Sequence, residues 1–350
     1  MRISLMFAGG GGMTVRDMVD LAVEAEAAGA DGVFLPEAWR SGFVTITAIA
    51  AATERIEIGP YVVNAHAHSP LFTGIAAVDL DEFSNGRLVL GVGSGNKVTN
   101  ERYQGIPVVK PLAKMRDYVA VLHRVTRAGR GTRVDHDGTM HSTSGWHAQV
   151  QPVRPDLPVV LAATSPRMTR MAGEVADGVA LGSLLGVEHI RQLLRDELVG
   201  VDADFRVMAS AFVAVHEDRE VARDAARSAV VNLFAGKPHP HYDSLLRQQG
   251  HANVADAIID AVAADDILAA HRAVSDEVLN ALTICGTVGD CIAGIDRYRG
   301  VVSDLILVNA SGMRYQEGDE AVGNEGSELV RSFDPIMDLL RALRSGGRSG

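Results

Sequence analysis

Four short polar segments of the chain combine residue types that could bind a ligand or move a proton, and each follows a short apolar run. They cover residues 37–38, 64–68, 91–96 and 164–167. In a parallel sheet, the carboxyl ends of the strands meet at one edge, where β/α barrels and open α/β sheets bind their ligands. We therefore take these four segments as the candidate functional site.

The segment 91–96 is rich in glycine and ends the apolar run 88–92. Its order, G-x-G-x-G-N, differs from the G-x-G-x-x-G of a dinucleotide fingerprint, and no acidic residue ends a second strand ~20 positions later. At the mouth of a barrel, the missing β-carbon of Gly93 would let a flat ligand approach the backbone. A plain turn is the alternative.

The segment 164–167 has the form of a helix start. Ser165 is predicted as the N-cap and Pro166 as the first helical residue. The first-turn amides and the positive end of the helix dipole would then favour a phosphate group, with the Thr164 hydroxyl or Arg167 assisting. A simple helix cap is the alternative.

Three ionisable side chains occur in the remaining segments. Glu37 follows the run 33–35 and would face the same strand edge, or else lie on the surface near Arg40. His66 and His68 form a His-x-His pair, which binds a metal in barrel amidohydrolases. Because the later strand ends offer poor metal ligands, a polar lining of the site or an exposed loop is the favoured interpretation of the two histidines.

Short apolar runs alternate with amphipathic segments along the chain, which predicts βαβ units and a parallel sheet. Eight strands with intervening helices favour a (β/α)8 TIM barrel over a doubly wound sheet, which would need fewer strands and a phosphate-binding first turn. The predicted strands are 3–7, 33–35, 56–63, 88–92, 159–162, 179–181, 206–215 and 305–308.

Two stretches interrupt this alternation. Residues 129–155 are polar and predict an excursion or a hairpin. Residues 219–282 are Ala-rich and mostly helical, with a helical insertion after strand seven at about 236–283. A terminal helix is predicted over 327–343, and the whole chain, 1–350, is expected to form one domain.

The composition is that of a globular protein, with 47% hydrophobic residues and a formal net charge of −11. An acidic chain without a basic run repels phosphate backbones, so no nucleic-acid partner is expected. No membrane span is expected either, because no run of about 18 apolar residues occurs. Cys285 and Cys291 are too few for a secreted disulfide framework, and they favour a reducing, cytoplasmic location.

Three motifs resemble the bacterial-luciferase-like superfamily. They read TERIEIG at 53–59, SNGRLVLGVGSGNK at 84–97 and SPRMTRMAGEVADGV at 165–179. The resemblance spans nearly the whole chain. It is closest to the coenzyme F420-dependent oxidoreductases of the methylenetetrahydromethanopterin reductase type.

This resemblance implies a barrel with a tricyclic redox ring in its C-terminal mouth. It also implies a bulge with a non-proline cis peptide at the end of strand three, at Tyr61–Val62 or the next bond, which backs the ring. The residues expected by position to contact the coenzyme are Glu37, Ala38, Tyr61, Val62, Val63, Asn64, Gly93, Asn96 and Thr99. Those expected to hold its phosphate are Thr164, Ser165, Pro166 and Arg167.

The chemistry implied by the resemblance is hydride transfer between C5 of the deazaflavin and a small organic substrate. Protonation, where it is needed, would fall to Glu37, His66 or solvent. The acid and base residues of relatives that act on sugar phosphates or on the pterin are absent, because Ala38, Asn96 and Met6 stand in their places. Neither substrate is therefore carried over.

Two other functions fit the same barrel. One is an FMN-dependent monooxygenase or reductase, and the other is a non-catalytic flavin-binding protein, which the missing acid and base groups would suit. Relatives commonly pair through their first helices, so a homodimer is expected. The substrate pocket is expected to be shaped by residues 129–155, the helical insertion and the end of strand eight at 309–314.

Overall fold

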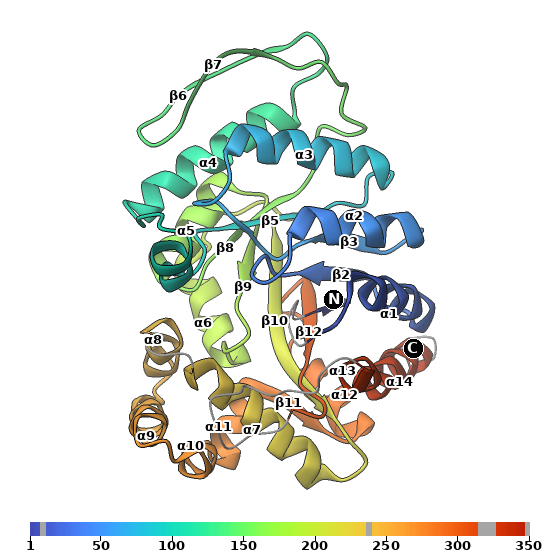
Figure 1. Cartoon of the computed structure of the whole chain (residues 1–350), viewed down its shortest axis with the longest axis vertical. Helices are drawn as coiled ribbons and strands as arrows, with labels where there is room; N and C mark the ends of the chain where they lie inside the picture. The colour runs from blue at the N-terminus through green and yellow to red at the C-terminus, as the bar shows by residue number, and fades with distance from the viewer. Residues whose placement is uncertain (8–11, 236–239, 314–326, 347–350) are drawn as a thin grey trace. The chain divides into compact units, whose positions relative to one another are not determined.

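The computed structural model describes residues 1–7, 12–235, 240–313 and 327–346 (Figure 1). Two compact units can be distinguished within it. The first comprises Met1–Ala30, Gly182–Gln192 and Ala209–Gly350, and the second comprises Asp31–Leu181 and Leu193–Met208. The single domain predicted over 1–350 stays a prediction.

The second unit holds every residue of the candidate site, and its strands pair in parallel. β2 (Gly32–Leu35) pairs with β3 (Glu57–Pro60), while β4 (Val63–Asn64), β5 (Leu90–Gly93), β8 (Val159–Ala162) and β9 (Gly178–Leu181) lie side by side in that order. Their side chains are mostly buried, as parallel strands covered by helices require. The predicted strands are confirmed here, except that 56–63 is two strands interrupted at Tyr61–Val62.

Helices alternate with these strands, as predicted. The Oγ atoms of Ser41 and Ser165 each accept a backbone N–H of the first turn at 3.4 Å, which fixes where two of the helices begin. Proline occupies the first turn of the other two, where it removes no helical hydrogen bond. The helices are α2 (Gly42–Ala52), α3 (Pro70–Phe83), α4 (Pro111–Thr126) and α5 (Pro166–Val175).

A β-hairpin occupies the excursion predicted over 129–155. Its strands β6 (Arg133–Asp137) and β7 (Ser142–His147) pair antiparallel, and in Figure 1 the hairpin lies above α3 and α4. Apolar side chains from the hairpin and the two helices form one buried cluster, which attaches the hairpin to them. The cluster contains Val121, Val125, Ala128, Val134 and Ala148, with Leu71, Ile75 and Trp146 packed against it.

A partly buried ion pair ties the chain that leaves the hairpin to the start of β5. Asp81, in α3, is 2% exposed, and Arg154 donates Nε and Nη2 to its two carboxylate oxygens at 2.9 and 2.8 Å. Asp81 Oδ1 also accepts the Leu88 amide at 3.1 Å, and Arg154 Nη2 donates to the Leu88 carbonyl at 2.6 Å. The pair therefore fixes the approach to the strand that carries the glycine turn.

The first unit contains β1 (Arg2–Met6), β12 (Asp304–Asn309), β11 (Thr283–Gly286) and most of β10 (Arg206–Val215). β12 lies between β1 and β10, and β11 pairs with β10. α1 (Val15–Ala28) begins at a capping box formed by Thr14 and Asp17. The helix ends at Gly29, which adopts a left-handed φ of 105°.

The predicted helical stretch 219–282 is confirmed, although residues 236–239 of the predicted insertion lie outside the described residues. β11 was not predicted, because its four residues follow a helix without an intervening turn residue. The helices not yet given are α6 (Val187–Glu197), α7 (Arg219–Ala235), α8 (Pro240–Gln248), α9 (Ala252–Ala263), α10 (Ile267–Ala273), α11 (Asp276–Leu282), α12 (Val288–Asp296), α13 (Ser327–Arg331) and α14 (Asp334–Gly346). Among the described helices, none has the length and apolarity that a membrane span needs.

Replacing Asp81 with Ala is expected to lower the free energy of unfolding by about 3 kcal/mol, because Arg154 would lose its counter-charge and the Leu88 amide its acceptor. Urea unfolding followed by circular dichroism measures this change. The matched control is Glu174→Ala, which breaks the exposed Arg116–Glu174 pair and should cost less than about 1 kcal/mol. Equal losses in the two variants would contradict the anchoring role of Asp81.

Candidate functional site

The backbone between β3 and β4 makes a bulge at the carboxyl end of the sheet. The peptide bond Tyr61–Val62 is cis, which confirms the first of the two positions expected from the resemblance. The Tyr61 hydroxyl donates to the carbonyls of Leu181 and Met208 at 2.9 and 3.1 Å, and the Tyr61 amide donates to Leu35 at 2.8 Å. These bonds hold the first residue of the bulge to neighbouring strands.

The glycines of β5 make room for this bulge. A β-carbon on Gly91 would lie 2.5 Å from the Pro60 carbonyl oxygen, and one on Gly93 would lie 2.7 Å from Val62 and 2.9 Å from Ala162. The prediction that the missing β-carbon of Gly93 lets a flat ligand approach is therefore wrong in its physical reason. The space is taken by the protein's own bulge, and a contact between Gly93 and the coenzyme stays a prediction.

Two asparagines connect the end of the bulge to the glycine turn. Asn64 Nδ2 donates to Asn100 Oδ1 at 2.6 Å, and Asn100 Nδ2 donates to the Ser94 carbonyl at 2.9 Å. Gly95, with a φ of +66°, allows the approach, because a β-carbon there would lie 2.5 Å from Asn64 Oδ1. Asn64 was predicted as a site residue, whereas the buried Asn100 was not.

Asn96 and Thr99, the predicted contacts after β5, are half-buried beside this connection. Asn96 Oδ1 accepts the Val98 amide at 2.8 Å, which closes a turn before the short π-helix η1 (Thr99–Tyr103). This turn and helix carry Asn100 to its place against Asn64. That Asn96 and Thr99 touch the coenzyme stays a prediction.

Glu37 holds the same loop from the other side. Its Oε2 accepts the Asn64 amide at 3.0 Å and lies 2.9 Å from His68 Nε2, while its Oε1 accepts the Gly42 amide at 3.5 Å. Burial alone would raise the pKa of Glu37, but the donors from His68 and Asn64 outweigh it and the pKa is lowered. The hydrogen bond to Glu37 in turn raises the pKa of His68. Glu37 is therefore an ionised positioning group, and its partner is His68.

His66 is buried, with 7% of its surface exposed, and its backbone amide donates to Asn64 Oδ1 at 3.1 Å. Neither of its ring nitrogens has a hydrogen-bond partner in the described part of the chain. Burial, and then the charge of Lys114, lower the pKa of His66. The backbone of Ser94 raises this pKa, but its effect is smaller. At neutral pH the ring is therefore neutral and offers one donor and one acceptor to a bound molecule.

Two basic side chains that were not predicted lie in the surroundings of His66. Lys114, in α4, loses hydration by burial, which lowers its pKa, and its charge lowers the pKa of both His66 and His141. His141, in the loop between β6 and β7, packs edge-on against Tyr118 with 5.6 Å between ring centroids, and its buried Nε2 has no partner among the described residues. The hairpin therefore supplies a polar group to this region.

The N-terminus of α5 is open to solvent. Ser165, Pro166 and Arg167 are exposed and Thr164 is half-buried, so an anion can reach the first turn of the helix. The predicted N-cap Ser165 is confirmed by its hydrogen bond to the Met168 amide. Phosphate binding at this turn stays a prediction.

The two histidines of the His-x-His pair have different surroundings in the described part of the chain, because His68 is bonded to Glu37 while neither ring nitrogen of His66 has a hydrogen-bond partner there. In the described ranges, no three His, Cys, Asp or Glu side chains gather closely enough to hold a metal ion. Ala38, at the end of β2, is exposed.

Exchanging Glu37 for Gln is expected to lower the free energy of unfolding at pH 6, because the charged hydrogen bond to His68 is lost. The loss should be only about 1 kcal/mol, since His68 is partly exposed to solvent. Because the pKa of His68 is raised, its charge contributes to the free energy of unfolding in full below pH 6.5, the ordinary value. This contribution is lost as the pH rises through the raised pKa. Because the pKa of Glu37 is lowered, its carboxylate contributes to the free energy of unfolding above pH 4.5. This contribution is lost as the pH falls through the lowered pKa.

The difference between wild type and Glu37→Gln in urea unfolding should therefore be larger at pH 6 than at pH 9. The control is Glu188→Gln, which removes an exposed carboxylate 3.5 Å from Arg191 and should show little effect at either pH. A difference for Glu37→Gln that grows toward pH 9 would contradict the ion pair.

Comparison with known proteins agrees with this geometry. Residues 3–304 match the family model described as luciferase-like monooxygenase. A 5,10-methylenetetrahydromethanopterin reductase of Archaeoglobus fulgidus is 30% identical over 315 residues, which cover 86% of this chain and 92% of that protein.

Two solved structures share the fold. The coenzyme F420-dependent tetrahydromethanopterin reductase of Methanopyrus kandleri has a TM-score of 0.76 at 19% identity, covering 96% of this chain and 97% of that one. An F420-dependent secondary alcohol dehydrogenase in complex with an F420–acetone adduct has a TM-score of 0.74 at 16% identity, covering 98% and 99%. These likenesses confirm the predicted (β/α)8 barrel, and the match over residues 3–304 shows that the chain belongs to the luciferase-like monooxygenase family.

Proposed function

We propose that the chain is an oxidoreductase that uses coenzyme F420 to transfer a hydride to or from a small organic substrate. The observation that carries the proposal is the bulge at Tyr61–Val62, which lies against the glycines of β5 at the carboxyl end of the sheet. The named activities of the relative and of the two solved structures support it.

The residues around the bulge fit a tricyclic coenzyme. Val62 is half-buried and carries no charge, so it offers an apolar wall to one face of a flat ring. The exposed start of α5, with Arg167, suits a phosphate on the same coenzyme. When bound, F420 supplies a hydride at C5 of its deazaflavin ring. The remaining residues proposed to contact it are Glu37, Ala38, Tyr61, Val63, Asn64, Gly93, Asn96, Thr99, Thr164, Ser165 and Pro166.

His66 is the residue we assign to proton transfer. Glu37 is a poor proton donor at neutral pH, because its carboxylate is ionised and already accepts hydrogen bonds from Asn64, Gly42 and His68. His66 is neutral, buried and unpaired at both ring nitrogens, so it can give or accept a proton at Nδ1 or Nε2 without first breaking a bond to the described protein. Glu37 and His68 would affect the proton transfer only by fixing the position of the loop at 64–68 that carries His66.

An FMN-dependent monooxygenase or reductase is the second candidate, because the matching family model carries the monooxygenase description. The same bulge and the same helix start would serve an FMN ring and its phosphate. The predicted homodimer and cytoplasmic location stay predictions.

Titration with each coenzyme distinguishes the two candidates. We expect F420 to bind at least tenfold more tightly than FMN, as measured by quenching of coenzyme fluorescence. Arg167→Gln should weaken F420 binding by roughly tenfold, the effect of losing one charged hydrogen bond to a phosphate. Arg170→Gln is the matched control, because Arg170 lies on the same helix but pairs with Glu197 at 2.6 Å. Tighter binding of FMN would favour the second candidate, and no binding of either would contradict both.

His66→Ala is expected to lower kcat about 100-fold or more while F420 binding changes little, because a positioned acid or base contributes that much to a proton transfer. The assay follows oxidation of reduced F420 with 2-cyclohexen-1-one as the probe acceptor, since its reduction consumes one hydride and one proton. His147→Ala removes an exposed imidazole of β7 and is the control. An unchanged kcat in His66→Ala would remove the assignment. No turnover by wild type with this or related acceptors would favour a non-catalytic flavin-binding role.

A further inference from the structure

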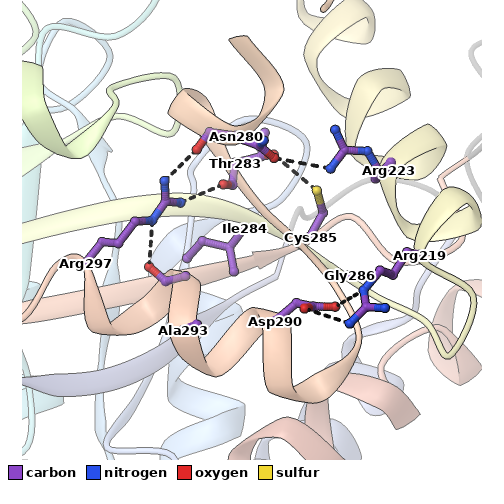
Figure 2. Close-up of a pocket in the computed structure, with 11 residues that line it drawn as sticks. Arg219, Arg223, Asn280, Thr283, Ile284, Cys285, Gly286, Asp290, Ala293 and Arg297 are labelled. Atoms are coloured by element: carbon purple, nitrogen blue, oxygen red, sulfur yellow. Dashed lines mark hydrogen bonds and ion pairs between the residues drawn. The ribbon is translucent and has the colours of Figure 1, made fainter. Parts of the chain in front are cut away.

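A cavity that is open to solvent lies in the first unit, and none of its lining residues belongs to the proposed function. It has a volume of about 300 Å³ and is lined by β11, by residues of α7, α11 and α12 and by Arg297 (Figure 2). Three of the described residues that line it are arginines, Arg219, Arg223 and Arg297, and one is a carboxylate, Asp290. The lining residues therefore carry more positive than negative charge, whereas the chain as a whole has a net charge of −11.

Arg297 carries a charge that no described carboxylate balances. Its Nε, Nη1 and Nη2 donate to the backbone carbonyls of Gly294, Asn280 and Thr283 at 3.3, 2.6 and 3.1 Å. Figure 2 shows the bonds to Asn280 and Thr283. These three bonds fix the plane of the guanidinium, and each terminal nitrogen keeps one further N–H. The side chain is therefore held in place with a positive charge and donors to spare.

Arg219 and Arg223 are also held in fixed positions. Asp290 accepts Nε and Nη2 of Arg219 at 2.7 and 3.1 Å, so Nη1 of Arg219 has no partner within the described ranges. Arg223 bonds Asp276 at 2.7 Å and the side-chain oxygen of Asn280 at 3.3 Å through its two terminal nitrogens. Both side chains thus offer N–H groups whose directions are set before any ligand arrives.

The positive charges of the arginines affect the thiol of Cys285, which lines the cavity. Burial raises its pKa overall, but the charges of Arg223, Arg227 and Arg297 each act to lower it. The arginines thus produce a positive potential at the cavity wall, even though two of those lining it are paired with aspartates. Cys291 is fully buried, so Cys285 is the more accessible of the chain's two thiols.

We infer that this cavity binds a small molecule that carries phosphate or carboxylate groups, with Arg219 and Arg297, which lie at different sides of the cavity in Figure 2, donating to different oxygen atoms of it. Planar guanidinium groups held in fixed orientations match the oxygen atoms of such anions. The volume lies at the lower end of the range for small-molecule sites, which suits a small anionic metabolite better than a dinucleotide. None of the residues that line this cavity is among those proposed to hold the coenzyme, so neither proposal depends on the other.

Isothermal titration calorimetry of the full chain tests this inference with two probes, inorganic phosphate and citrate. Sodium chloride at matched ionic strength is the reference. We expect saturable binding of at least one probe, and the one that binds more tightly identifies the chemical group. Bound anion should also slow the alkylation of Cys285 by neutral iodoacetamide several-fold, as measured by peptide mass spectrometry, which locates the binding in this cavity.

Three variants locate the donors. Arg219→Gln and Arg297→Gln should each weaken binding by roughly tenfold, the effect of losing a charged hydrogen bond. Arg299→Gln is the matched control, because Arg299 pairs with Asp296 at 2.6 Å on the same segment and does not line the cavity. Arg297→Gln loses three backbone contacts, which can prevent it from folding. Arg219 is 66% exposed, so Arg219→Gln should fold and keeps the inference testable on its own.

The inference is overturned if neither probe gives saturable heat with wild type. It is also overturned if Arg219→Gln binds as tightly as Arg299→Gln, or if saturating anion leaves the alkylation of Cys285 unchanged.

Discussion

The close approach of the bulge to β5 is the constraint on which the candidate site depends. Pro60 and Val62 come so near to Gly91 and Gly93 that a β-carbon on either glycine would overlap them. Because the bulge lies there, the chain beyond it presents Asn64 to Asn100 and turns His66 inward. A strand of four residues with two glycines thus sets the geometry of side chains that lie thirty residues away in the sequence.

The candidate site contains one charged pair, Glu37 and His68, and one neutral imidazole, that of His66, in different surroundings. Glu37 and His68 form an ion pair at the outer side of the loop, where His68 is 40% exposed and solvent lowers the cost of the charges. His66, two residues away, is buried, and both its burial and the charge of Lys114 disfavour a positive charge on its ring. One short segment therefore holds a protonated and a neutral imidazole at the same pH, because their surroundings differ.

The sequence patterns predicted what local chemistry determines. The alternation of apolar runs and the N-cap at Ser165 were both confirmed, because each depends on neighbours within a few residues. The partner of Glu37, the buried Asn100 and the nearby His141 could not be predicted, since they depend on which distant segments meet. A glycine indicates that something approaches closely, but it does not say what, and for Gly93 this was the protein's own Val62.

The hairpin β6–β7 is attached to α3 and α4 by an apolar cluster of its own, and Arg154 binds Asp81 where the chain leaves it. Its loop brings His141 against Tyr118 without contributing a strand to the parallel sheet. Mutations or insertions in that loop can therefore accumulate without disturbing the barrel strands. A lineage of such proteins can therefore vary this one appendage while inheriting the parallel strands unaltered.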